Sequence, residues 1–214
     1  MKRVLVTAFA PYGEWQENAS WLALQALTRN LPLSVDVTTR LYPVDFAEAR
    51  VRLASDLQSP FDAVLHVGQA PGSAAIRLES VALNTRREPC ETPDATRLLE
   101  PDGPVAYRSR LPLADWAELL KSEGLPVEVS LHAGDYLCNA ALYWSHHFLA
   151  QQDRQAMAAF VHVPLDISQA AHQKSTAPSL PSEVSGYALR LLLEELSGDA
   201  PTALEAKAES QGTA

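Results

Sequence analysis

The chain alternates short apolar runs with longer segments in which apolar residues recur every three or four positions. The apolar runs cover residues 3–9, 35–41, 63–67 and 159–164, and each has the composition of a buried strand. Strands of this kind that alternate with helices are typical of a sheet covered on both faces. We therefore expect an α/β protein, a three-layer α/β/α sandwich whose central sheet is mostly parallel.

Local signals place the helices between these strands. Asn18 or Ser20 suits the start of a helix that ends near Asn30, and Asp45 begins a capping box for a helix that continues to about Leu57. Further segments with helical spacing are 115–123, the residues that follow 138, and 182–196.

The remaining segments define the expected domain. Residues 75–83 suit a further strand, whereas residues 84–112 are rich in charge, proline and turn residues, and a loop of that length is usually functional. A chain of 214 residues with 47% hydrophobic content suits one domain, which we place at residues 1–198. Residues 199–214 contain hardly any apolar anchor, so we expect a disordered C-terminal tail there.

Composition argues against several classes of partner. The 17 Lys and Arg residues against 26 Asp and Glu residues give a net charge of −9, so neither nucleic acid nor a membrane surface is expected as a partner. No apolar stretch approaches the ~20 residues of a membrane helix, and the first residues lack the apolar core of a signal peptide. We therefore expect a cytoplasmic protein.

The two cysteines, Cys90 and Cys138, are too few to indicate a disulfide framework. The spacing of cysteines and histidines also does not match that of a zinc site, so we expect no metal.

Cys138 stands where a strand gives way to a helix. Residues 127–131 alternate like a strand, and the apolar spacing becomes helical after Cys138. Unpaired N–H groups and the dipole at the start of a helix favour negative charge, and the thiolate is the nucleophilic form of cysteine. Cys138 is therefore a candidate nucleophile, and the alternative is a buried cysteine that serves as a small apolar residue.

A nucleophilic cysteine needs a base and a group that orients the base. His162 lies near the end of the last predicted strand, and Glu79 lies in a largely apolar run where an unpaired carboxylate would be unfavourable. His66 and His132 also lie at strand ends, and spacing alone does not choose among the three histidines. Alternatively, His162 is a hydrogen-bonded core residue, and Glu79 points to water or pairs with Arg77.

Eight short stretches, taken together and in order along the chain, form a more specific pattern than any one of them alone. They are residues 4–13, 18–21, 66–70, 78–84, 103–107, 111–112, Tyr136–Leu137–Cys138–Asn139 and Phe160–Val161–His162–Val163–Pro164. With these stretches the chain resembles the type I pyroglutamyl peptidases, also called pyrrolidone-carboxylate peptidases, from Val4 to about Leu196.

The resemblance implies both a reaction and the residues that perform it. The implied reaction is release of an N-terminal pyroglutamyl residue from peptides through a thioester acyl-enzyme that water resolves, with no metal or cofactor. Cys138 is then the nucleophile, His162 the general base and later the acid, and Glu79 the group that orients the imidazole. The family's tendency to assemble further implies a homo-oligomer, a tetramer or a dimer.

The resemblance also implies a binding pocket. Phe9 and Tyr12 match an aromatic pair that packs on the five-membered lactam ring, and aromatic walls suit a flat, neutral ring. Gln69 matches the position beside this pair, and Asn18 lies in another matching stretch, so both are candidate substrate-binding residues. Without the resemblance, Phe9 and Tyr12 would be interpreted as core residues at a strand end.

Several positions depart from the family's pattern. Ala8, Tyr12 and Glu14 stand at the first glycine, the second aromatic and the last glycine of the motif Gly-Phe-x-Pro-Phe-Gly-Gly, and Asp135 stands in place of threonine. Tyr12 keeps the aromatic ring but adds a hydroxyl that needs a partner.

The largest departure follows Asn84, where the family has Asp-Asp-Ala-Arg-Ile-Pro with an arginine near the oxyanion site. This chain has no arginine at the aligned position, but Arg86 or Arg87 could reach the same place after a small loop shift. Loss of one oxyanion donor lowers the rate roughly a hundredfold to a thousandfold. This altered segment motivates one alternative, a catalytically impaired homologue that binds pyroglutamyl-like ligands. The changes at Ala8, Tyr12 and Asp135 leave room for another, a cysteine amidohydrolase for another small acyl group.

Overall fold

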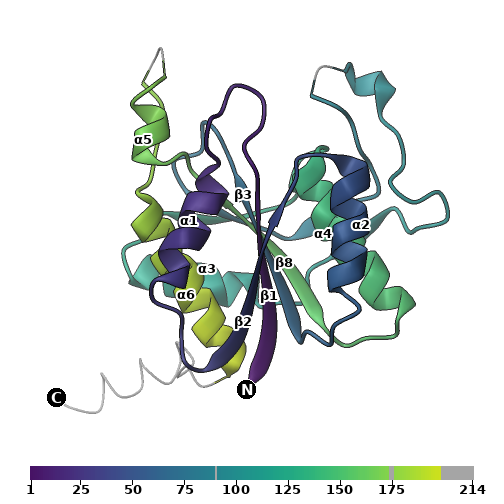
Figure 1. The fold of residues 1–214 in the computed structure, drawn as a ribbon, viewed down its shortest axis with the longest axis horizontal. Helices are drawn as coiled ribbons and strands as arrows, with labels where there is room; N and C mark the ends of the chain where they lie inside the picture. Colours follow the sequence, from purple (N-terminus) through teal and green to yellow (C-terminus); the bar gives the residue numbers. More distant parts are fainter. Residues whose placement is uncertain (90, 174–175, 199–214) are drawn as a thin grey trace.

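The computed structural model describes residues 1–89, 91–173 and 176–198 (Figure 1). The elements in chain order are β1 (Lys2–Phe9), α1 (Ala19–Thr28), β2 (Val35–Tyr42), α2 (Phe46–Asp56), β3 (Ala63–Gln69), β4 (Ile76–Glu79), β5 (Val81–Leu83), a 3-10 helix (Pro93–Ala95), β6 (Ala106–Arg108), α3 (Leu113–Ser122), β7 (Val127–Ser130), α4 (Leu137–Gln151), β8 (Met157–Val163), α5 (Ile167–Ala170) and α6 (Ser182–Ser197). The tail predicted at 199–214 and the side chain of Cys90 lie outside the described residues.

The predicted helix starts are present at α1 and α2. Asn18 is the N-cap of α1 and its side chain accepts a hydrogen bond from the Ser20 backbone N–H. Asp45 caps α2 in the same way by accepting from the Glu48 backbone N–H, at 2.8 Å. These bonds satisfy donors that the first turn of a helix otherwise leaves unpaired.

The central sheet, within the described residues, has six strands in the order β2-β1-β3-β8-β4-β7. Strands β2, β1, β3 and β8 are parallel to one another, whereas β4 pairs antiparallel with β8 and parallel with β7. The prediction of a mostly parallel sheet is therefore confirmed, and its one antiparallel pairing joins the strands that carry Glu79 and His162.

Helices cover both faces of this sheet, as predicted (Figure 1). Helices α1, α3 and α6 pack on one face through a core that includes Leu24, Trp116 and Leu189. Helices α2 and α4 pack on the other face through a second core, which includes Leu53 and Leu142. The fold is thus a three-layer α/β/α sandwich.

Strand β3 continues two residues past the predicted run, which ends at residue 67. Gly68 and Gln69 remain in register with His162 and Val163 of β8. A side-chain carbon at Gly68 would lie 2.6 Å from the Phe160 ring and 3.0 Å from the Cys138 Sγ atom. Glycine at this position therefore makes room for a core ring and for the sulfur, rather than ending the strand.

The run predicted as one strand over 75–83 is divided into β4 and β5 at Ser80. The Ser80 backbone N–H and hydroxyl both donate to the Ser130 carbonyl, at 2.9 and 2.7 Å, and its own carbonyl accepts from the Ser109 N–H. Ser80 therefore forms a corner between the two strands. After this corner, β5 leaves the central sheet and pairs with β6 in a separate two-stranded sheet.

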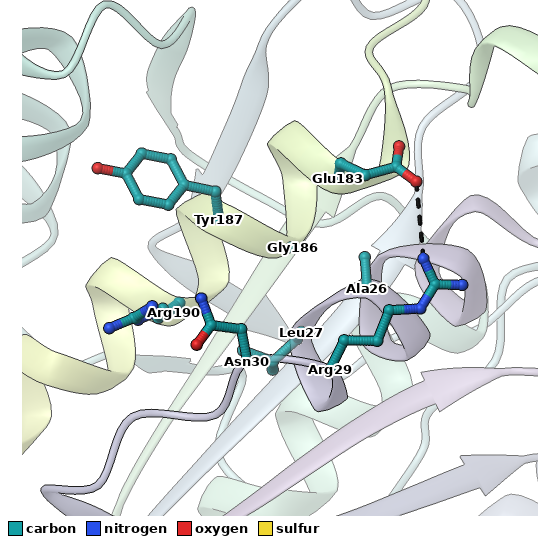
Figure 2. Close-up of a pocket in the computed structure, with 8 residues that line it drawn as sticks. All are labelled: Ala26, Leu27, Arg29, Asn30, Glu183, Gly186, Tyr187 and Arg190. Atoms are coloured by element: carbon teal, nitrogen blue, oxygen red, sulfur yellow. Dashed lines mark ion pairs between the residues drawn. The ribbon is translucent and has the colours of Figure 1, made fainter.

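Helices α1 and α6 cross closely at Gly186. A side-chain carbon at this position would lie 2.8 Å from the Ala26 Cβ and 2.9 Å from the Leu27 backbone nitrogen, so glycine permits the approach. A surface groove lies beside the crossing, where Arg29 forms an exposed ion pair with Glu183 (Figure 2).

Because the first and last helices of the described chain pack together, we infer one domain over residues 1–198. In residues 1–89, 91–173 and 176–198, the structure contains no helix with the length and apolar character needed to span a membrane.

Candidate active site

Cys138 is the second residue of α4, at the junction between strand and helix that the sequence predicts. The chain reaches this helix through Gly134, whose φ of +83° is a left-handed conformation that glycine adopts readily. Tyr136 occupies the N-cap position without a side-chain hydrogen bond to the helix. The N–H groups of the first turn are therefore available to an external acceptor, beside a partly exposed sulfur.

His162 lies on β8 and contacts Glu79 of β4. Glu79 faces Phe160 across the antiparallel pair, so its side chain is diagonal to His162 on the same face of the sheet. The His162 Nδ1 atom is 2.8 Å from the Glu79 Oε1 atom, and Glu79 has no exposed surface. Because a carboxylate only accepts hydrogen bonds, Nδ1 carries the proton, which leaves Nε2 for Cys138.

Arg77 is the alternative partner of Glu79 that the sequence leaves open. Its Nε atom is 4.0 Å from Glu79 Oε1 but 3.0 Å from the more exposed Glu128 carboxylate. The imidazole of His162 is therefore the hydrogen-bonded partner of Glu79, and Arg77 contributes a more distant positive charge.

The neighbours of His162 raise its pKa to about 9 from an ordinary value of 6.5. Burial by itself lowers this pKa, but the negative charge and hydrogen bond of Cys138, together with Glu79, outweigh burial. The resulting contribution to folding stability is fully present below pH 6.5 and is lost as the pH rises through about 9. The sulfur and the carboxylate thus both favour the imidazolium form of His162.

The other two candidate histidines lie in different surroundings. His66 is fully buried, with Nδ1 2.6 Å from the Thr7 hydroxyl and Nε2 2.7 Å from the Ser145 hydroxyl. Burial, assisted by His146, lowers the pKa of His66 to about 3. His132 is exposed and accepts a hydrogen bond from the Gly134 N–H. His66 is therefore a hydrogen-bonded core residue, and His132 is a surface residue.

A small pocket opens beside the sulfur. It brings together the predicted residues Phe9, Tyr12, Gln69 and Asn18, and it also includes three residues that the sequence analysis did not select: Val44, Tyr136 and Leu137. Tyr136 and Leu137 directly precede Cys138, and Val44 follows the carboxyl end of β2, where sites in such sheets gather. Their positions in the sequence could therefore have identified all three as candidate pocket residues.

The polar groups of the pocket differ in how they are satisfied. Both polar atoms of the Asn18 side chain bind within the protein, since the oxygen accepts from the Ser20 N–H and hydroxyl and the nitrogen donates to the Ala10 carbonyl. Gln69 Oε1 accepts from the Ala19 N–H at 2.8 Å, whereas its Nε2 has no hydrogen-bond partner among the described residues. Gln69, a residue that lines the pocket, therefore keeps one buried amide donor close to the Tyr12 hydroxyl.

Tyr12 adds a hydroxyl to the pocket. Burial and the negative charge of Cys138 raise the pKa of this phenol, and the amide of Gln69 acts to lower it. The phenol therefore stays protonated at neutral pH, close enough to Cys138 and Gln69 to be affected by both.

Arg86 and Arg87 do not line the pocket; both side chains bind elsewhere. The Arg86 guanidinium lies over the Phe46 ring, 5.4 Å from its centroid. Arg87 Nε donates to the Asp135 carboxylate at 2.7 Å, and the Arg87 N–H donates to the Asp135 carbonyl at 2.8 Å. Two departures from the family's pattern, at positions 87 and 135, thus form one ion pair.

Asn139, which follows the nucleophile, is a further residue that the sequence analysis quoted without a role. It is fully buried, and its amide exchanges hydrogen bonds with the Leu83 N–H and carbonyl and donates to the Thr85 carbonyl. These bonds fasten the end of β5 to the first turn of α4.

The fold and this arrangement of side chains together define a class of protein. Within the described residues, no cluster of histidine, cysteine, aspartate or glutamate is arranged to hold a metal ion. An α/β sandwich that aligns a cysteine, a histidine and a carboxylate beside a small pocket is typical of cysteine hydrolases.

Comparison with known proteins narrows this class. The sequence profile of the pyroglutamyl peptidase family matches residues 2–197. The pyrrolidone-carboxylate peptidase of Streptomyces coelicolor is 34% identical over 201 residues, which cover 90% of this chain and 91% of the relative. The pyrrolidone-carboxylate peptidase of Yersinia pestis is 33% identical over 202 residues, which cover 90% of this chain and 92% of the relative.

Solved structures agree with the sequence comparison. The pyrrolidone carboxyl peptidase of Fervidobacterium islandicum has a TM-score of 0.87 and 32% identity, and the match covers 92% of this chain and 99% of that one. The pyrrolidone carboxyl peptidase of Thermococcus litoralis has a TM-score of 0.84 and 27% identity, and the match covers 94% of this chain and 98% of that one. The chain belongs to the pyroglutamyl peptidase family.

We expect removal of either negative neighbour to lower the pKa of His162. Cys138→Ser removes the charge of the sulfur, and Glu79→Gln replaces the carboxylate with an amide of similar shape; each charge contributes to raising the pKa. NMR titration of the His162 imidazole measures the effect, with the buried His66 imidazole as an internal control. A His162 pKa that stays near 9 in both variants would contradict this electrostatic account.

Proposed function

We propose that the chain removes an N-terminal pyroglutamyl residue from peptides, with Cys138 as its nucleophile. The observation that carries the proposal is the alignment of Cys138, His162 and Glu79 beside a pocket walled by Phe9 and Tyr12. Family membership supports it, because relatives of matching length carry the name pyrrolidone-carboxylate peptidase.

The pocket suits a five-membered lactam. Phe9 and Tyr12 offer aromatic surface to a flat ring that carries no charge. The unpartnered Nε2 of Gln69 can donate to the lactam carbonyl. A buried donor without a partner costs about 1–3 kcal/mol, and a bound lactam would relieve that cost. A proline ring has the same size but no carbonyl, so the pocket should discriminate against it.

In the proposed acylation step, the Cys138 thiolate attacks the scissile carbonyl carbon and forms a C–S bond while the carbonyl electrons move to oxygen. The N–H groups of the uncapped first turn of α4 donate to this oxyanion. These backbone groups serve as donors because Arg86 and Arg87 are bound elsewhere. The C–N bond then breaks, and the imidazolium of His162 gives its Nε2 proton to the leaving amine. The pyroglutamyl group remains on sulfur as a thioester.

Deacylation uses the same imidazole in its neutral form. Acylation removes the charge of the sulfur, which is one of the interactions that raise the pKa of His162. The pKa therefore falls, and the imidazole stays neutral and can take a proton from water. The water oxygen attacks the thioester carbon, the C–S bond breaks, and the thiolate and imidazolium are restored. Glu79 holds the imidazole in the required orientation throughout.

We expect the purified protein to hydrolyse a pyroglutamyl fluorogenic amide under reducing conditions. Cys138→Ala should abolish turnover, and His162→Ala should lower kcat by about 10² to 10⁴, because it removes the general acid and base. His132→Ala is the matched control, since this exposed histidine contacts neither Cys138 nor the pocket.

The outcome would be decided by comparing these variants at equal folded concentration. Wild-type turnover by His162→Ala, or no turnover by the folded wild-type protein, would contradict the proposed function. In the second case the pocket would hold a ligand that it does not cleave, or the enzyme would act on another acyl group.

We further infer a homo-oligomer, a tetramer or a dimer. The family resemblance supports this, as do large apolar side chains that are exposed on the single chain, among them Leu33, Val105 and Leu131. Sedimentation equilibrium should give a multiple of the 23.3 kDa chain mass, and a monomer at all concentrations would contradict it. The cytoplasmic location stays a prediction, supported by the low cysteine content.

A further inference from the structure

Gln169 of α5 is hydrogen-bonded to Gln69, one of the residues that line the pocket. It is 8% exposed, and its Oε1 accepts a hydrogen bond from the Asp166 N–H at 2.9 Å. Its Nε2 donates to Gln69 Oε1 at 2.7 Å and to the Glu17 carbonyl at 3.1 Å. Every polar atom of this buried amide is therefore engaged, and one of its partners is the pocket residue Gln69.

These bonds determine which end of the Gln69 amide faces the pocket. An amide has a donor end and an acceptor end of similar shape, so its orientation depends on its neighbours. Backbone N–H groups only donate, so Asp166 fixes the orientation of Gln169, and Ala19 fixes that of Gln69. Gln169 then adds a second donor to Gln69 Oε1. With its oxygen doubly bound, Gln69 has only its Nε2, which is buried and without a hydrogen-bond partner among the described residues, left for a ligand in the pocket that it lines.

We propose that Gln169 is a positioning residue that sets the specificity of the pocket for a cyclic amide. It acts through Gln69, by holding the donor end of that side chain where a lactam carbonyl would bind. This inference rests on the proposed function, because it assumes that the pocket receives the pyroglutamyl ring. The short segment from His162 of β8 to Gln169 of α5 thus supplies both the proposed base and the support for recognition.

The variant Gln169→Glu tests this role with little change in side-chain shape. A carboxylate cannot donate to Gln69 Oε1 and repels it, so Oε1 keeps only its bond from the Ala19 N–H, and the orientation of the Gln69 amide is held less firmly. Because the bond to the lactam exists in both the ground state and the transition state, its loss should raise KM roughly tenfold to a hundredfold with little change in kcat. A variant that merely folds poorly would instead lose kcat at unchanged KM.

Ser168→Ala is the matched control. Ser168 lies in the same helix and its hydroxyl donates to the Asp166 carboxylate, but it is exposed and does not contact Gln69. This variant perturbs the start of α5 while leaving the bond between Gln169 and Gln69 intact. Its KM and kcat should therefore equal those of the wild-type protein.

Binding of 2-pyrrolidinone, the bare five-membered lactam, gives a readout that does not require turnover. Calorimetry should show its affinity reduced by Gln169→Glu by the same factor as the rise in KM, and unchanged by Ser168→Ala. If the wild-type protein turns over substrate but Gln169→Glu keeps both the wild-type KM and the wild-type lactam affinity, this inference is wrong and the proposed function stands. If the wild-type protein has no turnover, the proposed function fails, and lactam affinity still decides the role of Gln169.

Discussion

The buried carboxylate of Glu79 is the interaction on which the site depends. An ion taken out of water is destabilised by several kcal/mol unless a partner compensates. His162 supplies a 2.8 Å hydrogen bond and, as an imidazolium, the opposite charge. That imidazolium is in turn stabilised by Cys138, against burial that would otherwise remove its proton. Glu79 and Cys138 thus both favour the protonated form of the imidazole that lies between them.

The sheet topology makes this alignment possible. Because β4 lies between β8 and β7 and runs antiparallel to β8, Glu79 comes to lie diagonal to His162 on the face covered by α4. Strand β3 pairs with the opposite edge of β8, and its Gly68, which has no side chain, leaves space for the Cys138 Sγ atom. Helix α4 then brings Cys138 into the site in its first turn, where no side chain caps the helix.

Local features of the sequence were sufficient to predict most of the fold. Apolar periodicity located the central strands, and the caps at Asn18 and Asp45 located two helix starts, because these signals act within a few residues. The sequence also predicted that Glu79 needs a partner. Spacing alone could not choose among His66, His132 and His162, because that choice depends on strand order and on a contact between residues more than 80 positions apart; only the family resemblance selected His162.

The same limit applies to other parts of the site. The corner at Ser80 depends on its bonds to Ser130 and Ser109, which lie far along the chain. Gln169 gave no sequence signal, since its function follows only from the position of Gln69. The ion pair between Arg87 and Asp135 likewise becomes visible only when the loop is folded against α4.

The central claim is that Cys138 carries the acyl group, and trapping that intermediate tests it most directly. The wild-type protein would be mixed with a reactive pyroglutamyl ester, quenched in acid within milliseconds, digested, and analysed by mass spectrometry. The chain has two cysteines, so peptide mapping separates the possibilities. The account predicts a pyroglutamyl thioester on the peptide that contains Cys138 and none on the peptide that contains Cys90. An adduct on Cys90, or on any residue other than Cys138, would contradict it.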